Sequence, residues 1–185
     1  MVLPIYAYGQ PVLKKIARDI GPDYPELEQL IADMWETMEA ANGVGLAAPQ
    51  IGRDIRLFVI DSGPMQEEGE EHLGIRRAFI NAEIVEEAGE DTSYAEGCLS
   101  IPDVNGDVER PEEITMTYLD TDFQPHTETF TGMNARVIQH EYDHIEGILF
   151  TELLKPLKKR MVKRKLDKIR RGEVDVRYRM KFVRG

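Results

Sequence analysis

The segment His140-Glu141-Tyr142-Asp143-His144 is the feature that most constrains this chain, because it places two imidazoles and a carboxylate within five residues. Apolar residues from Met133 to Ile148 recur at helical spacing. Four residues make about one helical turn, so His140 and His144 project from one face and can bind one divalent ion. Glu141 lies ~100° around the axis, beside the open coordination position. The spacing is typical of metal-dependent hydrolysis, although two such histidines can also be half-buried without a ligand.

The helix does not identify a third ligand. Metzincins have a histidine six residues after the second ligand, and Phe150 occupies that position here, so that class is excluded. His72 lies in an acidic loop and His126 on a predicted strand among polar neighbours, so we expect both to be solvated. Cys98, in the segment 96–102, is the remaining soft ligand. It is either a small buried residue or the thiolate of a His2Cys metal site.

The composition is that of a compact cytoplasmic domain. The chain has 185 residues, of which 42% are hydrophobic and 31% charged, which argues against wholesale disorder and coiled coils. A single cysteine cannot form an internal disulfide, and the N-terminus lacks the pattern of a secretory signal. No apolar run approaches the ~20 residues of a membrane-spanning helix. We therefore expect a single catalytic domain over 1–185 in a reducing cytoplasm.

Charge is divided unevenly along the chain. Residues 1–154 carry 9 of the 23 Lys and Arg residues and 31 of the 34 Asp and Glu residues, a net charge of −22. Residues 155–185 carry 14 and 3, a net charge of +11. A polyanion should therefore be repelled by the body and attracted by this basic C-terminal extension.

The remaining pattern predicts an α+β fold. Helical spacing is also found over residues 24–41 and from Pro156 to Arg171. Strand patterns cover residues 55–61, 78–86, 113–119 and 126–130. No helical pattern separates these strands, so we expect them to be antiparallel and to pack around the central metal-binding helix, with a C-terminal basic helix. Residues 62–74 read as a solvated acidic loop.

Three segments resemble the signature motifs of the peptide deformylase family, in the same order and with compatible separations. They are Gly43–Gly52 (GVGLAAPQIG), Glu96–Pro102 (EGCLSIP) and Gln139–Gly147 (QHEYDHIEG). Pro11-Val12-Leu13 also fits, and the likeness extends from about Pro4 to Leu154.

The resemblance implies a metallohydrolase that removes the formyl group from the N-terminal methionine of newly synthesised polypeptides and releases formate. It implies that Cys98, His140 and His144 hold a divalent ion, natively Fe2+, with Zn2+, Ni2+ or Co2+ also possible. The fourth position would carry water. Glu141 would then carry the proton, while the backbone N–H of Leu99 and the side-chain amide of Gln50 would stabilise the developing oxyanion.

The resemblance also implies a set of substrate-binding residues. Gly43, Gly45 and Gly97 would allow close approach of the backbone to the peptide. Glu96 would shape the pocket mouth, oriented by Arg110. The methionine side chain would occupy an apolar slot formed by Val44, Tyr94, Met133 and Val137. Residues 103–107 (DVNGD) depart from the family pattern, since some relatives carry an arginine there.

Two alternative functions belong to other classes. The first is a gluzincin-like metallopeptidase with Glu173 as its third ligand, which the basic surroundings of Glu173 disfavour. The second is an RNA-binding protein with a structural metal. An open fourth position argues against it, because structural sites have four protein ligands.

The basic extension has two interpretations. Lys155 to Arg171 holds ten Lys and Arg residues against one acid, Asp167. It is either a solvated helix docked by its few apolar residues or a contact with ribosomal RNA, a use known in this family. The apolar residues are Leu157, Met161, Leu166 and Ile169. On the second interpretation, truncation after Leu154 should abolish ribosome binding and leave hydrolysis of a free tripeptide largely intact.

Overall fold

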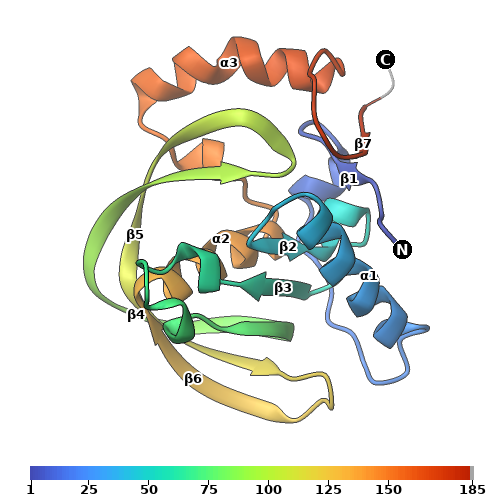
Figure 1. The fold of residues 1–185 in the computed structure, drawn as a ribbon, viewed down its shortest axis with the longest axis vertical. Coiled ribbons are helices and arrows are strands. Elements are labelled where there is room, and N and C mark those ends of the chain that lie inside the picture. The colour runs from blue at the N-terminus through green and yellow to red at the C-terminus, as the bar shows by residue number, and fades with distance from the viewer. Residues whose placement is uncertain (184–185) are drawn as a thin grey trace.

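The computed structural model describes residues 1–183 and confirms the predicted α+β fold (Figure 1). One sheet has the order β2-β3-β4-β5-β6, and every neighbouring pair is antiparallel, as the sequence predicts. Its strands are β2 (Gly45–Ala47), β3 (Leu57–Asp61), β4 (Arg76–Cys98), β5 (Ile101–Leu119) and β6 (Pro125–Thr131). Short 3-10 helices cover Pro11–Lys14, Ala48–Ile51, Gly63–Met65, Glu71–Leu73 and Phe150–Leu153.

The two longest strands extend well beyond the predicted segments. β4 and β5 form a curved ribbon that sweeps from the sheet to α3 (Figure 1), and β-bulges interrupt their register at four points. The second half of β4 is mostly exposed, so it lacks the apolar pattern of a strand and is held by its pairing with β5. In β5, buried and exposed residues alternate, with Val104, Gly106, Val108 and Arg110 buried. Because two of these are a glycine and an arginine, the sequence does not show the alternation of apolar and polar residues that is typical of a strand.

Two helices cover opposite faces of the sheet. α1 (Leu27–Ala40) packs on Leu57 and Val59 of β3, whereas α2 (Gly132–Ile145) packs on Phe58 and Ile60. β3 is buried on both faces, which explains its unbroken apolar sequence. Both helices fall within one to three residues of the predicted bounds. The sheet therefore provides a rigid support for α2, the helix that carries His140 and His144.

The basic extension packs against the rest of the chain. α3 (Pro156–Arg170) buries Val162, Leu166 and Ile169 in a core shared with β5 and the N-terminal segment. Leu157 and Met161 are 70% and 65% exposed, so their predicted docking role is wrong. The buried set recurs at i, i+4 and i+7, and this spacing places the other two side chains on a different face of the helix.

After α3 the chain returns to its own N-terminal end. β7 (Met180–Lys181) pairs in parallel with β1 (Ile5–Tyr6), which the sequence does not predict. A truncation after Leu154 would remove this pair together with part of the core. That truncation is therefore a poor test of what the basic residues do.

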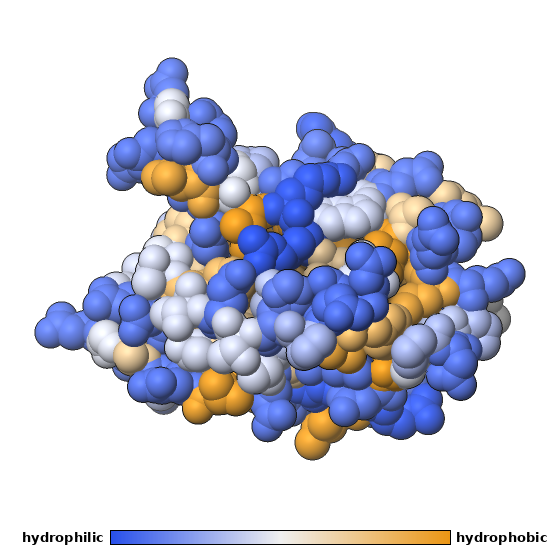
Figure 2. Space-filling model, turned by 90° about the horizontal axis from the view of Figure 1, so that it is seen from below, coloured by the Kyte–Doolittle hydropathy of each residue, from blue (hydrophilic) through white to orange (hydrophobic). Residues whose placement is uncertain are grey.

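The face shown in Figure 2 is mainly hydrophilic, with hydrophobic residues in smaller areas among them. Among residues 1–183, no helix is both long and apolar enough to cross a membrane.

Candidate metal centre

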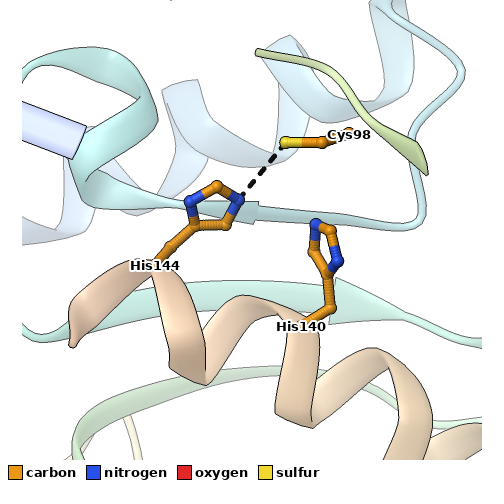
Figure 3. A group of neighbouring side chains, drawn as sticks. All are labelled: Cys98, His140 and His144. Atoms are coloured by element: carbon orange, nitrogen blue, oxygen red, sulfur yellow. Dashed lines mark hydrogen bonds between the residues drawn. The ribbon is translucent and has the colours of Figure 1, made fainter. Parts of the chain in front are cut away.

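The two histidines of α2 lie one helical turn apart and face the same way, as the sequence predicts. Their ring centroids are 5.2 Å apart, and both rings point toward Cys98 (Figure 3). Cys98 is the last residue of β4, directly before the two-residue turn Leu99–Ser100 that leads into β5. The curved ribbon thus places a residue 42 positions earlier in the chain against the histidine face of α2.

The distances among the three side chains fit a single metal ion. One ligand atom from each of Cys98, His140 and His144 lies within 4.8 Å of the others. The Sγ atom of Cys98 is 3.4 Å from Nε2 of His144. Metal–sulfur and metal–nitrogen bonds of ~2.3 and ~2.0 Å at a tetrahedral angle separate the two donor atoms by roughly 3.5 Å. A thiolate and two imidazoles suit several first-row divalent ions.

The two histidines have different electrostatic surroundings. Burial lowers the pKa of His144 well below its ordinary value, so the ring is neutral, as a ligand must be. Burial opposes a charge on His140, but hydrogen bonds with Cys98 and Glu96 raise its pKa well above the ordinary value. The surroundings of His140 therefore favour positive charge, which a bound cation supplies.

A buried ion network fixes the orientation of His140. Nδ1 of His140 lies 2.9 Å from Oε1 of Glu96, which leaves Nε2 as the ligand atom. Arg110 donates two hydrogen bonds to Glu96, at 2.7 and 2.9 Å, and one to Asp143 at 2.8 Å. Arg136 of α2 donates another to Glu96 at 2.8 Å. Although burial opposes ionisation, His140 and Arg110 hold the pKa of Glu96 well below its ordinary value.

The family resemblance predicts the contact between Arg110 and a carboxylate, but it gives no role to Arg136. This arginine also donates to the carbonyl oxygens of Val108 at 2.9 Å and Thr92 at 2.7 Å. It thereby ties α2 to both strands of the curved ribbon. Its position four residues before His140 is the one signal that could have suggested a role, since that spacing places both side chains on one face.

Glu141 lies beside the cluster and lines a cavity in front of it. The residue is 4% exposed, and its Oε2 has no hydrogen-bond partner among the described residues. Burial raises the pKa of Glu141 to about 7. A Cβ atom on Gly45 would lie 2.5 Å from Oε1 of Glu141, so only glycine fits there. A buried carboxylate with a pKa near neutrality suits a group that accepts and returns a proton.

Gln50 presents its amide to the same cluster. It lies in the 3-10 helix Ala48–Ile51 and is 1% exposed. Its Oε1 accepts a hydrogen bond from the Ala47 N–H at 2.9 Å, which fixes the amide orientation. Its Nε2 donates to Sγ of Cys98 at 3.4 Å and to Oγ of Ser100 at 3.1 Å. The donor end of the amide therefore faces the ligand cluster.

A cavity of about 760 Å³ opens in front of the cluster and contains most of the residues predicted from the sequence. Those residues are Gly43, Val44, Gly45, Gln50, Tyr94, Glu96, Gly97, Cys98, Leu99, Val137, His140 and Glu141. A Cβ atom on Gly43 would lie 2.7 Å from the Leu99 side chain, and one on Gly97 would lie 2.6 Å from Asn105. Glycine at these positions lets the two walls of the cavity approach closely.

Met133 is the predicted slot residue that lies elsewhere. It lines a separate cavity of about 460 Å³ beside Gly89, Thr92 and Glu112. Met133 is in the first turn of α2, which faces the part of the β4–β5 ribbon around Gly89 and Glu112. Arg136 lines both cavities, and the place of Met133 in the slot stays a prediction.

Several cavity residues were not anticipated. Met65 comes from the acidic loop, and residues 175–178 come from the C-terminal extension. The alternation of Val174, Val176 and Tyr178 with charged residues could have indicated an extended segment with one buried face.

The residues proposed as other third ligands do not approach the cluster. His72 and His126 are both exposed, and His126 bonds to Asp120 at 2.7 Å. Glu173 is exposed and bonds to Arg171 at 3.0 Å. A metallopeptidase site that uses Glu173 is therefore not formed.

Comparison with known proteins gives a consistent result. A family model described as polypeptide deformylase matches residues 2–160. The chain is 54% identical over 189 residues to a peptide deformylase of Christiangramia forsetii, covering 98% of this chain and 96% of that protein. It is 53% identical over 182 residues to a peptide deformylase of Cytophaga hutchinsonii, covering 98% of each.

Solved structures agree with the sequence relatives. A crystal structure of a peptide deformylase from Legionella pneumophila matches with a TM-score of 0.81 and 39% identity, covering 94% of this chain and 98% of that one. The peptide deformylase structure from Thermus thermophilus matches with a TM-score of 0.81 and 37% identity, covering 94% and 100%.

Proposed function

Because this chain belongs to the polypeptide deformylase family, we propose that Cys98, His140 and His144 hold its divalent metal ion and that Glu141 carries the proton. The reaction removes the formyl group from the N-terminal methionine of a newly synthesised polypeptide and releases formate. The observation that carries the assignment is that the three ligand atoms lie together beside Oε2 of Glu141, which has no hydrogen-bond partner within residues 1–183. Fe2+ is the native ion in this proposal, and Zn2+, Ni2+ or Co2+ would also fit the ligand set.

A divalent ion held by Cys98, His140 and His144 would supply Lewis acidity, which makes water a stronger nucleophile near neutral pH. Glu141 takes the proton of the attacking water at Oε2 and later returns it to the leaving amine. As negative charge builds on the formyl oxygen, the amide of Gln50 and the backbone N–H of Leu99 donate hydrogen bonds to it. Glu96 keeps His140 oriented throughout.

The methionine side chain is held by apolar residues of the same cavity. Val44 and Val137 form the buried part of the slot, and Tyr94, which is 37% exposed, closes its outer edge. Gly43, Gly45 and Gly97 leave room for the substrate backbone. Met133 lines the neighbouring cavity, which shares Arg136 with this one.

The proposal also covers the organisation and location of the protein. Residues 1–185 are one catalytic domain in this proposal, since α3 shares one core with β5 and the N-terminal segment. The protein acts in the cytoplasm, where nascent chains that begin with formylmethionine emerge. The first test of the proposed function measures the reaction itself.

Protein purified without oxygen should release formate from formyl-Met-Ala-Ser and leave unformylated Met-Ala-Ser intact. A site built around a formyl group should also spare internal amide bonds. Metal content measured on the same sample should identify iron at about one ion per chain. Cleavage of an internal bond in an unblocked peptide, or no formate release by the iron-loaded protein, would refute the assignment.

The exposed side of α3 supports the further proposal that ribosomal RNA is a partner. Val162, Leu166 and Ile169 dock the helix, and most of its basic residues remain in solvent. The exposed ones are Lys155, Lys159, Arg160, Lys163, Arg164, Lys165, Lys168 and Arg170. Such a cationic surface suits sequence-independent contact with phosphates.

Replacing Lys159 and Lys163 by Gln should weaken ribosome co-sedimentation and reduce its salt dependence. Each lost phosphate contact should lower the log–log slope by ~0.7 to 0.9. Hydrolysis of a free tripeptide should not change, because both side chains lie outside the cavity. The matched control replaces Lys15 and Arg53, two exposed basic residues of the body. Equal binding by both double variants would contradict RNA contact through α3.

A further inference from the structure

The segment that follows α3 forms part of the wall of the catalytic cavity. Residues 175–178 line it, although they lie beyond the 2–160 match to the family model. Along this segment Val174, Val176 and Tyr178 are partly buried, while the residues between them are exposed. Val174 packs on the core cluster that also contacts Cys98. The inward face of the segment is therefore turned toward the reaction site.

Tyr178 bonds to the turn that carries the catalytic backbone. Its hydroxyl donates to the carbonyl oxygen of Leu99 at 2.7 Å. Leu99 directly follows the ligand Cys98 and is the first residue of the turn between β4 and β5. The second residue, Ser100, accepts a hydrogen bond from the Tyr8 N–H at 2.9 Å. Both carbonyls of this turn are thus held from outside the β4–β5 hairpin.

The two outside contacts are themselves joined. The Ile5 N–H donates to the Arg179 carbonyl, and the Ala7 N–H donates to the Lys181 carbonyl, each at 2.9 Å. The β1–β7 pair therefore fixes Tyr178 and Tyr8 in one rigid unit against the turn. On the other side, the Leu99 side chain is close to Gly43, where an added Cβ would lie 2.7 Å away.

We propose that Tyr178 is a positioning residue of this enzyme, which holds the Leu99 peptide units so that the Leu99 N–H points at the developing oxyanion. The inference rests on the proposed function, which gives the Leu99 N–H that role. The Leu99 N–H belongs to the peptide unit that joins Cys98 to Leu99, and the Leu99 carbonyl belongs to the next unit along the chain. A hydrogen bond to that carbonyl holds the next unit, and with it the Leu99 Cα atom to which the N–H is attached. Small misplacements of catalytic groups have large effects on rate.

Tyr178→Phe tests this role, because it removes the hydroxyl and keeps the ring. We expect kcat for formyl-Met-Ala-Ser to fall about tenfold, with KM and metal content close to those of the unaltered protein. The matched control is Tyr24→Phe, which removes a hydroxyl that bonds to Arg53 on another part of the molecule. The control should retain its kcat. An unchanged kcat for Tyr178→Phe, or a rise in KM alone, would overturn the proposal.

A second measurement does not depend on activity. Hydrogen exchange of the amides in residues 96–101 should be faster in Tyr178→Phe than in Tyr24→Phe, because the turn loses one of its two outside contacts. Equal protection in the two variants would also overturn the proposal. If the unaltered protein released no formate, the proposed function would fail, and the exchange result would still decide whether Tyr178 holds the turn.

Discussion

Glu141→Gln should retain its metal ion and lose at least ~10²-fold of its turnover. The substitution leaves Cys98, His140 and His144 unchanged, so the ligand set is intact. Glutamine has nearly the same shape and fits beside Gly45, where an added Cβ would already touch the carboxylate. Its amide cannot accept a proton and return it. The loss should therefore appear in kcat, measured as formate release from formyl-Met-Ala-Ser.

The metal content of Glu141→Gln must be measured on the same sample, since loss of the ion would lower turnover for another reason. Glu28→Gln, an exposed position on α1, is the matched control and should have normal turnover. Retained metal together with near-normal formate release would show that Glu141 is not the proton carrier.

Cys98→Ser should weaken metal binding and reduce formate release with it. A serine hydroxyl is a harder ligand and stays mostly protonated, whereas thiolate is the metal-binding form of cysteine. The loss of affinity should exceed the 10- to 100-fold that removal of an outer hydrogen-bond partner costs. Metal titration of the dialysed protein measures this effect directly.

Cys98→Ala provides the reference for complete loss of the third ligand. The serine variant should fall between it and the unaltered protein. If Cys98→Ser bound metal with unchanged stoichiometry and affinity, Cys98 would be a buried residue of the core, and another side chain would have to complete the site.

The chain's local patterns indicated the central helix and much of the sheet. The pair His140 and His144 could be assigned to one face because helical spacing depends only on neighbouring residues. The strand predicted at residues 55–61, which the structure has at Leu57–Asp61, and the helix after Pro156 also follow from local patterns. The identity of the family was also evident, since three long motifs occur in the correct order.

The sequence could not predict the length of β4 and β5, or which residues form the core that α3 shares with β5 and the N-terminal segment. The outer half of β4 is largely exposed, so its conformation depends on hydrogen bonds to β5 rather than on an apolar pattern. The burial of Val162 in place of Leu157 and Met161 depends on which face of α3 meets β5. Such choices depend on packing between distant segments, and spacing along the chain does not contain that information.

By itself the sequence determined the chemistry of the site: a thiol, two imidazoles one helical turn apart, and a carboxylate next to the first of them. Only the tertiary structure decided how these groups are held. It placed Cys98 3.4 Å from His144, surrounded Glu96 with two arginines, and returned Tyr178 to the turn after Cys98. The physical reason is that residue type and helical phase are local properties. The distance between groups far apart in the chain depends on the packing of the whole core.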